Sequence, residues 1–370
     1  MIEFKLPSLG ADMDEGKLLQ WKVKPGDKVK RGDVVAVVDT SKAAVEVEIW
    51  QDGTVHQLIV EPGTKVPVGA VLALLLAPGE SAAAVPAAAV PAVAVPAKAE
   101  ARKPVSPAAR KRAGELGVDV EKVRGTGAQG AVTVEDVEKA AAPAAAAPDR
   151  AAEMRKAIGA AMSRSKREIP HYYLSQTIPM LRATEWLARE NEKRPVTARI
   201  LMAVLQLKAV ALALKKFPDL NGFWRDGAYR PSSAVHVGVA ISLREGGLIA
   251  PAIHDVPEKP LDELMKDLSD LVKRARAGSL RSSEMSDPTI TVSNLGEGGV
   301  ESTFAIIYPP QVAIVGFGRI ASRPWAEGEA LRALPTVIAS LSADHRASDG
   351  HRGALFLAEL ARFLQEPEKL

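Results

Sequence analysis

Apolar and polar residues repeat in one pattern over the first part of the chain. A shift of 37 positions places Gly16 on Gly53. The same shift places the Pro25-Gly26 turn on the Pro62-Gly63 turn. Each copy has an alternating run, the Pro-Gly turn, a Lys-Val pair, a glycine turn and an apolar run, which is typical of short strands joined by tight turns. The pattern predicts an all-β domain of two quasi-repeated sheets over residues 1–78.

One lysine lies at the junction of the two copies. The apolar run of the first copy ends at Val38 and alternation resumes at Val45, so that Lys42 falls between them. Connecting turns are the most exposed points of a short-looped β domain. We therefore expect Lys42 at the tip of a turn, either as a modification site or as an ordinary solvated lysine.

Two Ala/Pro-rich stretches, residues 79–103 and 141–149, separate the patterned parts of the chain. In the first of them, prolines recur every five positions at Pro86, Pro91 and Pro96. This composition cannot bury enough apolar surface to fold, and the prolines favour an extended backbone. The uncharged run is shorter than the ~20 residues that a membrane-spanning helix needs. We predict two linkers and no membrane anchor.

The island between the linkers, residues 104–140, has the signals of two short helices. Ser106 or Pro107 can begin the first helix, and Thr133 can cap the second. The glycine-rich sequence at 125–130 has the form of a dinucleotide fingerprint, but a βαβ unit does not surround it. We interpret it as a glycine-rich loop in a small helical domain.

Basic residues are concentrated in this island. Seven basic residues stand against three acidic ones between positions 102 and 124, and Arg110 and Lys111 are adjacent among them. Such a patch favours binding of an acidic protein partner. Nucleic-acid binding is a weaker alternative, and the simplest alternative is a solvated basic face without a partner.

From residue 150 to residue 370 the composition is that of a globular domain. Apolar residues recur at helical spacing over 153–167, 201–216, 261–277 and 355–365. Strand-like apolar runs alternate with them at 235–243, 289–293, 311–315 and 336–343. The pattern predicts an α/β domain with one large antiparallel or mixed sheet.

Composition narrows the chemistry. The 370 residues include no cysteine, which excludes disulfides, thiolate nucleophiles and cysteine-bound zinc. A net charge of +3 gives no general case for nucleic-acid binding. The first residues lack both an apolar signal region and an Arg/Ser-rich transit pattern, and we expect a cytoplasmic location.

One segment near the end of the chain suggests acid–base chemistry. His345 follows a strand-like run, and Asp349 and Gly350 follow the histidine before the last helical pattern. Histidine can accept a proton near neutral pH, and a thiol is a reachable donor because its pKa lies only about two units higher. A lone motif of this kind also fits a structural turn. The histidines His56, His171, His236 and His254 are expected to be structural or surface residues.

The chain resembles a known family in each of its parts. Residues 1–78 resemble a lipoyl domain through Pro7-Ser8-Leu9-Gly10, Pro25-Gly26-Asp27 and Thr40-Ser41-Lys42-Ala43. Residues 104–140 resemble a peripheral-subunit-binding domain through Gly117-Val118-Asp119 and Gly125-Thr126-Gly127.

The remaining part, residues 150–370, is similar to dihydrolipoamide acyltransferases, the core components of 2-oxo acid dehydrogenase complexes. The similarity lies in the His345-x-x-x-Asp349-Gly350 motif, in Thr291-Val292-Ser293-Asn294-Leu295-Gly296 and in Pro309-Pro310-Gln311. The resemblance implies a chloramphenicol-acetyltransferase-like fold for this part.

The resemblance also implies roles for individual residues. Lys42 would carry lipoic acid in amide linkage, and coenzyme A would be the second substrate. His345 would deprotonate the attacking thiol, Ser293 would donate to the oxyanion, and Asp349 would support the turn. The active site would form between subunits of a homotrimer or larger core. Arg110 and Lys111 would contact a partner enzyme.

The implied partners are a thiamine-diphosphate-dependent 2-oxo acid decarboxylase and dihydrolipoamide dehydrogenase, with neither nucleic acid nor membrane. Acetyl, from pyruvate or acetoin, is the first choice of acyl group, branched-chain acyl is the second and succinyl the third. Two other classes stay open: a non-catalytic lipoyl-bearing scaffold, and a chloramphenicol-type acetyltransferase acting on a free small molecule.

Overall fold

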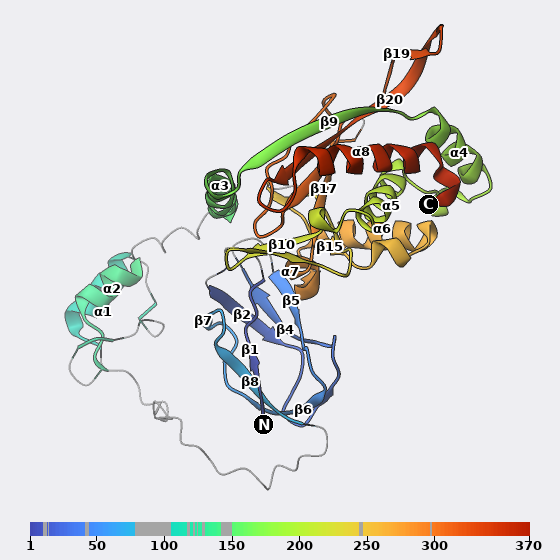
Figure 1. The fold of residues 1–370 in the computed structure, drawn as a ribbon. Helices are drawn as coiled ribbons and strands as arrows, with labels where there is room; N and C mark the ends of the chain where they lie inside the picture. The colour runs from blue at the N-terminus through green and yellow to red at the C-terminus, as the bar shows by residue number, and fades with distance from the viewer. Residues whose placement is uncertain are drawn as a thin grey trace. The chain divides into compact units, whose positions relative to one another are not determined.

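The computed structural model describes residues 1–9, 13, 15–40, 44–77, 105–116, 119–120, 123, 125–127, 130–141, 150–243, 247–296 and 298–370. Its chain forms two compact units (Figure 1). One unit comprises Met1–Ala82 together with Met154–Leu370, and the other comprises Ala83–Glu153. Apart from Ala141, both predicted linkers lie outside the described residues.

The N-terminal domain is built from short strands, as the repeat predicts. Its strands are β1 (Ile2–Lys5), β2 (Glu15–Trp21), β3 (Lys28–Val29), β4 (Val34–Asp39), β5 (Ala44–Glu48), β6 (Gly53–Leu58), β7 (Lys65–Pro67) and β8 (Val71–Leu76). One sheet has the order β1-β8-β6-β3, and the other contains β5-β4-β2-β7. Apolar side chains from both sheets form the core between them.

The sequence repeat becomes a reciprocal exchange of hydrogen bonds between the two copies. The amide of Gly26 donates to the carbonyl of Val55 at 2.7 Å, and the amide of Gly63 donates to that of Leu18 at 2.6 Å. Leu18 and Val55 are themselves related by the repeat. The two turn glycines have φ values of 97° and 94°, a region that favours glycine. Each copy therefore needs its Pro-Gly turn to hold the other.

The middle unit is a small helical domain, as predicted. Helix α1 (Pro107–Leu116) packs on α2 (Val134–Ala141) through Ala109, Ala113 and Val137. Ser106 Oγ accepts from the Ala109 amide, and Thr133 exchanges hydrogen bonds with Asp136 at the start of α2. Both predicted helix starts are confirmed.

Asp136 ties the glycine-rich loop of this domain to α2. Its buried carboxylate accepts from the backbone and hydroxyl groups of both Thr133 and Thr126. These hydrogen bonds, with the Thr133 backbone foremost, lower the pKa of Asp136 far below its ordinary value. A side chain at Gly125 would meet the Gly130 carbonyl oxygen at 2.3 Å, so this loop folds on itself.

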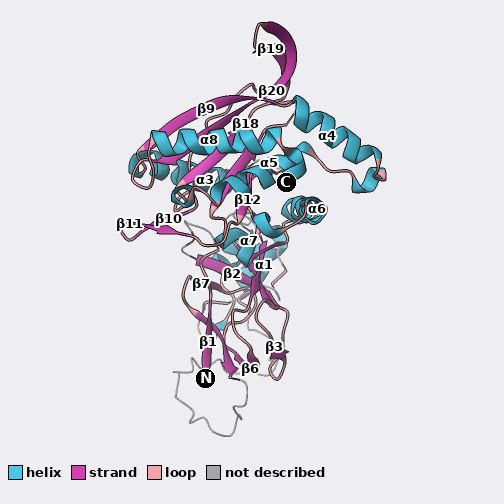
Figure 2. Cartoon of the chain, turned by 45° about the vertical axis from the view of Figure 1, so that its right-hand side comes forward, coloured by secondary structure: helices cyan, strands magenta, loops and turns pink. Residues whose placement is uncertain are grey.

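From Arg150 onward the chain forms an α/β domain around one large mixed sheet (Figure 2). Its helices are α3 (Arg150–Glu168), α4 (Leu181–Glu192), α5 (Met202–Leu214), α6 (Leu261–Ala277), α7 (Ser282–Ser286) and α8 (Gly350–Gln365), with 3-10 turns η3 (Val196–Ala198), η4 (Pro218–Leu220), η5 (Val256–Glu258) and η6 (Pro367–Lys369). Its strands are β9 (His171–Pro179), β10 (Gly222–Arg225), β11 (Ala228–Pro231), β12 (Val237–Val239), β13 (Ile241–Ser242), β14 (Leu248–Ile249), β15 (Ala252–Ile253), β16 (Leu280–Arg281), β17 (Ile290–Asn294), β18 (Ala313–Phe317), β19 (Ala321–Glu327) and β20 (Ala330–Asp344).

The large sheet has the order β15-β12-β17-β18-β20-β19, with β9 also paired to β20. β12, β17 and β18 are parallel, and the other pairs are antiparallel, which confirms the predicted mixed sheet. The predicted run 235–243 is split between two sheets, because β12 joins the large sheet while β13 pairs with β14. β16 adds to the edge of the N-terminal domain at β5.

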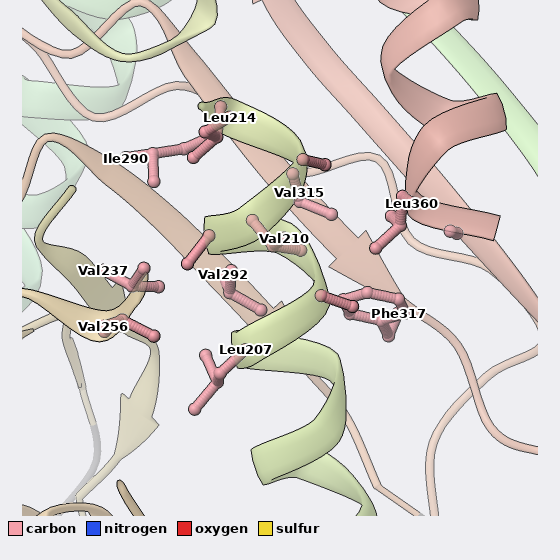
Figure 3. Close-up of a cluster of buried hydrophobic side chains, with 14 of the residues drawn as sticks. Leu207, Val210, Leu214, Val237, Val256, Ile290, Val292, Val315, Phe317 and Leu360 are labelled. Carbon is pink, nitrogen blue, oxygen red and sulfur yellow. The ribbon is translucent and has the colours of Figure 1, made fainter. Parts of the chain in front are cut away.

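Helix α5 lies at the centre of the core. Its side chains Leu207, Val210 and Leu214 pack with side chains of the sheet and of α8 (Figure 3). The segment 196–214 is long and apolar enough to cross a membrane by length and composition alone. In the described structure it is the core helix of this domain, which accounts for its apolar character on all sides.

A buried lysine on α5 fixes the neighbouring loop. Lys208 is 6% exposed, and its ammonium donates to the carbonyl oxygens of Pro257 at 2.8 Å and Lys259 at 2.7 Å, with Val256 at 3.4 Å. Burial lowers the pKa of Lys208. The ammonium thus ties together carbonyl groups of the loop that follows β15.

We expect Lys208→Met to lower the free energy of unfolding by about 2 kcal/mol, because it removes the donor to the partly buried carbonyl groups of Pro257 and Lys259. Urea denaturation followed by tryptophan fluorescence measures the change. The matched control is Lys215→Met at the end of the same helix, whose exposed ion pair with Glu258 should contribute little. Equal effects of the two substitutions would contradict the assignment.

Candidate active site

The predicted base lies on a tight turn at the end of the longest strand. β20 ends at Asp344, whose amide donates to the Val312 carbonyl at 2.8 Å. The next amide, of His345, donates to the Pro170 carbonyl at 3.0 Å. The edge of the Tyr172 ring faces the His345 ring at a centroid distance of 5.4 Å. The backbone on both sides of the turn is therefore anchored, while His345 itself is exposed.

An ion pair between a buried carboxylate and a more exposed guanidinium fixes this turn. The side chain of Asp344 is fully buried and accepts from the Arg346 amide at 2.9 Å and from its guanidinium at 2.6 to 3.1 Å. The guanidinium also lies over the Trp224 ring, 4.3 Å from its centroid. Bidentate and stacked contacts of this kind hold an arginine in one geometry. His345 is thus flanked by two residues that cannot move independently.

Asp349 begins the helix that follows the turn. Its carboxylate accepts from the Arg352 amide at 2.9 Å as the N-cap of α8. This hydrogen bond, followed by that of the His351 amide, lowers the pKa of Asp349. The Tyr172 hydroxyl lies 2.8 Å from Ser348 Oγ, which ties the same turn to β9.

Ser293 lies at the other end of the sheet within one chain. It is opposite Gly316 on β18, and Gly316 is opposite Ser340 on β20. Ser340 precedes His345 by five residues, which amounts to roughly 16 Å along the strand. One chain therefore cannot bring Ser293 and His345 onto a single reacting group.

Each end of the sheet has its own cavity. A cavity of about 760 Å³ adjoins the carboxyl end of β17 and is lined by Val292, Asn294, Gln206 and other mostly apolar residues. Asn294 donates to Gln206 there and accepts from the Gly296 amide, which fixes the turn after Ser293. The Tyr308 cavity, about 240 Å³, lies at the His345 end and is lined by Phe223, Arg225, Tyr308, Pro310, Gln311 and Ser8 among others.

The Tyr308 cavity and the His345 turn share neighbouring residues. Trp224, which stacks on Arg346, donates its amide to the Pro310 carbonyl at 2.8 Å. Phe223 forms a bridge with Gln311, and the carbonyl of the next residue, Val312, accepts from Asp344.

The remaining candidates fall elsewhere. Lys42 lies outside the described residues; β4 and β5, which precede and follow it in the sequence, are paired antiparallel as far as Asp39 and Ala44. Arg110 and Lys111 are exposed on α1.

His171 is structural in this geometry. Its Nε2 accepts from the Ile307 amide at 3.2 Å, so that Nδ1 donates to the Ile169 carbonyl at 2.9 Å. Burial lowers the pKa of His171, which favours this neutral form.

The sequence alone assigned no role to Tyr172, Trp224 or Arg346. Arg346 could have been suspected from its place beside His345, because Asp-His-Arg brackets the base with opposite charges. Tyr172 and Trp224 carried no local signal, since only the folded sheet brings them to the turn.

Comparison with known proteins agrees with this division of the chain. Residues 147–370 match the family described as 2-oxoacid dehydrogenases acyltransferase (catalytic domain). Residues 2–75 match the family described as biotin-requiring enzyme, and residues 103–138 match the e3 binding domain. The chain belongs to the family of 2-oxoacid dehydrogenase acyltransferases.

Full-length relatives share this organisation. A protein of Rhizobium meliloti (strain 1021), named dihydrolipoyllysine-residue acetyltransferase component of pyruvate dehydrogenase complex, is 34% identical over 99% of this chain and 98% of its own length. A protein of the same name from Rickettsia bellii is 30% identical over 99% and 98%.

Solved structures resemble the C-terminal part. A probable dihydrolipoamide acetyltransferase from Listeria monocytogenes has a TM-score of 0.54 at 29% identity, covering 57% of this chain and 91% of its own. The dihydrolipoamide acetyltransferase of Azotobacter vinelandii has a TM-score of 0.55 at 27% identity, covering 58% and 90%. The predicted order of an all-β, a helical and an α/β acyltransferase domain is confirmed.

We expect Arg346→Met to lower the free energy of unfolding by about 3 kcal/mol, because it leaves the carboxylate of Asp344 buried without its partner. Urea denaturation measures this loss, and Arg346→Lys should recover only part of it. The control is Arg332→Met in the β19–β20 hairpin, where the ion pair with Glu327 is exposed and should contribute little. An unchanged free energy of unfolding for the Arg346→Met variant would contradict this role of the Arg346–Asp344 ion pair.

Proposed function

We propose that this protein transfers an acetyl group between a lipoyl group on Lys42 and coenzyme A, as the acyltransferase component of a pyruvate dehydrogenase complex. The observation that carries the proposal is the spacing of the site residues. The Azotobacter vinelandii enzyme was studied for the role of a serine, a histidine and an asparagine in its catalytic mechanism, and these residues are 52 and 4 positions apart. Ser293, His345 and Asp349 have the same spacing.

The lipoyl group, when bound, supplies a thiol that carries the acyl group as a thioester. In the proposed reaction His345 accepts the proton of the coenzyme A thiol, and the sulfur attacks the thioester carbonyl carbon. Ser293 donates its hydroxyl to the oxygen that becomes negative. A donor placed on a developing oxyanion typically contributes about 2.7–4 kcal/mol. As the carbon–sulfur bond to the leaving thiol breaks, His345 returns the proton to that sulfur.

In this mechanism Asp349 acts through the backbone. Its cap of α8 fixes the turn on which His345 stands. The relative from Azotobacter vinelandii has an asparagine four positions after its histidine, where this chain has Asp349. Asparagine is equally able to cap a helix.

The site requires more than one chain. Because one sheet separates Ser293 from His345, the serine of one subunit must meet the histidine of another. Closed symmetric assembly of identical chains is the simplest arrangement that provides such pairs. A homotrimer, as the family resemblance implies, would form the site at each of its interfaces, and trimers can combine into larger cores.

The other partners follow from the domain order. The e3 binding domain supports docking of dihydrolipoamide dehydrogenase, with Arg110 and Lys111 on the exposed face of α1 as its contacts. A thiamine-diphosphate-dependent decarboxylase would load the acyl group. The bacterial relatives favour the cytoplasm, whereas a relative from Neurospora crassa is mitochondrial.

Mixing inactive chains tests the shared site. Ser293→Ala and His345→Ala should each reduce acetyl transfer to free dihydrolipoamide by roughly 10² or more. Co-expression of the two variants should restore about a quarter of the activity, because random trimers pair an intact serine with an intact histidine at that fraction of interfaces. Failure to restore any activity would contradict a site between subunits. Comparison of acetyl-, isobutyryl- and succinyl-CoA tests the acyl group, and a dominant succinyl rate would refute acetyl.

The carrier lysine has a separate test. Intact-mass measurement of native protein should show one lipoyl group per chain, and Lys42→Ala should abolish it. The same variant should keep its rate with free dihydrolipoamide, because its catalytic residues are intact. An unmodified Lys42 in native protein would refute the carrier role while leaving the acyltransferase reaction standing.

A further inference from the structure

The N-terminal domain presents an edge strand to a short strand near α7. β5 is the last strand of its own sheet, and β16 pairs with it in parallel register. Leu280 is opposite Val45, and Arg281 is opposite Glu46. Strand addition of this kind uses main-chain hydrogen bonds for attachment and side chains for selectivity.

A carboxylate fastens the end of this strand pair. Glu48 is the last residue of β5 and is only 8% exposed. Its carboxylate accepts from the Ser283 hydroxyl at 2.6 Å and from the Ser283 amide at 3.2 Å. Its own amide donates to Ser282 Oγ at 3.1 Å. Hydrogen bonds to a charged acceptor are stronger than neutral ones, so Glu48 is the main polar contact of the pair.

Contacts with α6 fix the segment of β16 and α7 that pairs with β5. Glu284, on the same short helix as the two serines, is 6% exposed and pairs with Arg274 of α6. Glu284 also accepts from the Arg281 amide at 2.9 Å. These contacts fix β16 and α7 independently of β5. Met285, also on α7, packs against the core of the N-terminal domain and against that of the α/β domain.

The paired domain reaches the histidine side of the sheet. Ser8 of the N-terminal domain lines the Tyr308 cavity together with Gln311 and other residues that adjoin the His345 turn. In sequence, Lys42 precedes β5 by two residues. β5, the strand that pairs with β16, is therefore the first strand after Lys42 in the sequence.

We propose that β16 and the serines Ser282 and Ser283 form a docking surface for the lipoyl domain of the same chain, used while its acyl group is transferred. This inference rests on the proposed function, since the docked domain must carry the lipoyl group. Among the described residues, the contact is centred on the two residue pairs of β5 and β16, the Glu48 carboxylate and Met285, and it is small. Tethering compensates for a weak contact, because the linked domain is present at an effective concentration set by the linker.

The first experiment measures transfer to the chain's own arm. The full-length, lipoylated and reduced protein is mixed with acetyl-CoA, and the gain of one acetyl group on the chain is followed by quenched intact mass. Glu48→Ala and Ser283→Ala should each slow this step roughly tenfold, since each removes a charge-assisted hydrogen bond. The double variant should be little slower than either single one, because both changes remove the same contact.

Two controls separate the possible failures. Free dihydrolipoamide does not use the docking surface, so both variants should keep the native rate with it. Glu61→Gln, on an exposed turn of the same domain, should leave both rates unchanged. Unchanged transfer to the chain's own arm in the Glu48 and Ser283 variants would overturn the docking surface. If the native protein failed to transfer acetyl groups to free dihydrolipoamide, the proposed function itself would be overturned.

A cross-link gives a readout that is independent of activity. The chain has no cysteine, so that a Glu46→Cys, Arg281→Cys double variant introduces the only two thiols. Facing residues of paired strands lie within the range that a disulfide spans. Mild oxidation should give an intramolecular bridge, whereas a Glu61→Cys, Arg281→Cys control should stay reduced. If the Glu46→Cys, Arg281→Cys variant kept its thiols reduced, or formed a cross-linked dimer, docking within one chain would be refuted.

Discussion

The position of β18 between β17 and β20 is the constraint on which the rest of this molecule depends. β17 runs parallel to β18 and β20 runs antiparallel to it, so the register places Ser293 and the His345 turn at opposite ends of one sheet. A rigid sheet cannot fold over to join them. Chemistry that needs both groups must be assembled between chains, and this makes self-association a requirement of the site.

The histidine end of the sheet is organised by two carboxylates with fixed partners. Asp344 is held by Arg346 under the Trp224 ring, and Asp349 caps the following helix. Lys208 and Glu284 have comparable roles in the loops around α5 and α6. A buried ion is tolerated only when its hydrogen bonds are satisfied, so Asp344, Lys208 and Glu284 also fix the geometry of their loops. These contacts fix the backbone turn that carries His345, while the side chain of His345 stays exposed.

In the proposed mechanism, delivery of the acyl group combines a tether with a contact. The predicted linkers would raise the local concentration of the carrier domain, and the edge of β5 would orient it through a short strand pair. A large interface would trap the carrier domain and stop it from reaching other enzymes. A small contact fastened by Glu48 is compatible with repeated release, because its few hydrogen bonds can be exchanged with water.

The sequence by itself determined the domain order and much of the local chemistry. The repeat of turn glycines predicted the two sheets of the first domain, since it marks the turns that join short strands. The helix starts at Ser106 and Thr133, and the mixed sheet of the last domain, could likewise be read from local capping and periodicity. The His345 motif could be singled out because an Asp-Gly pair follows it before a helix.

Only the tertiary structure decided what surrounds these residues. The distance between Ser293 and His345 depends on strand order and register, which are long-range pairings that local pattern does not encode. The same holds for Tyr172 and Trp224, which reach the turn from strands more than a hundred residues earlier in the chain. The pairing of β5 with β16 joins segments of two separate domains, and neither strand alone carries a signal of the other.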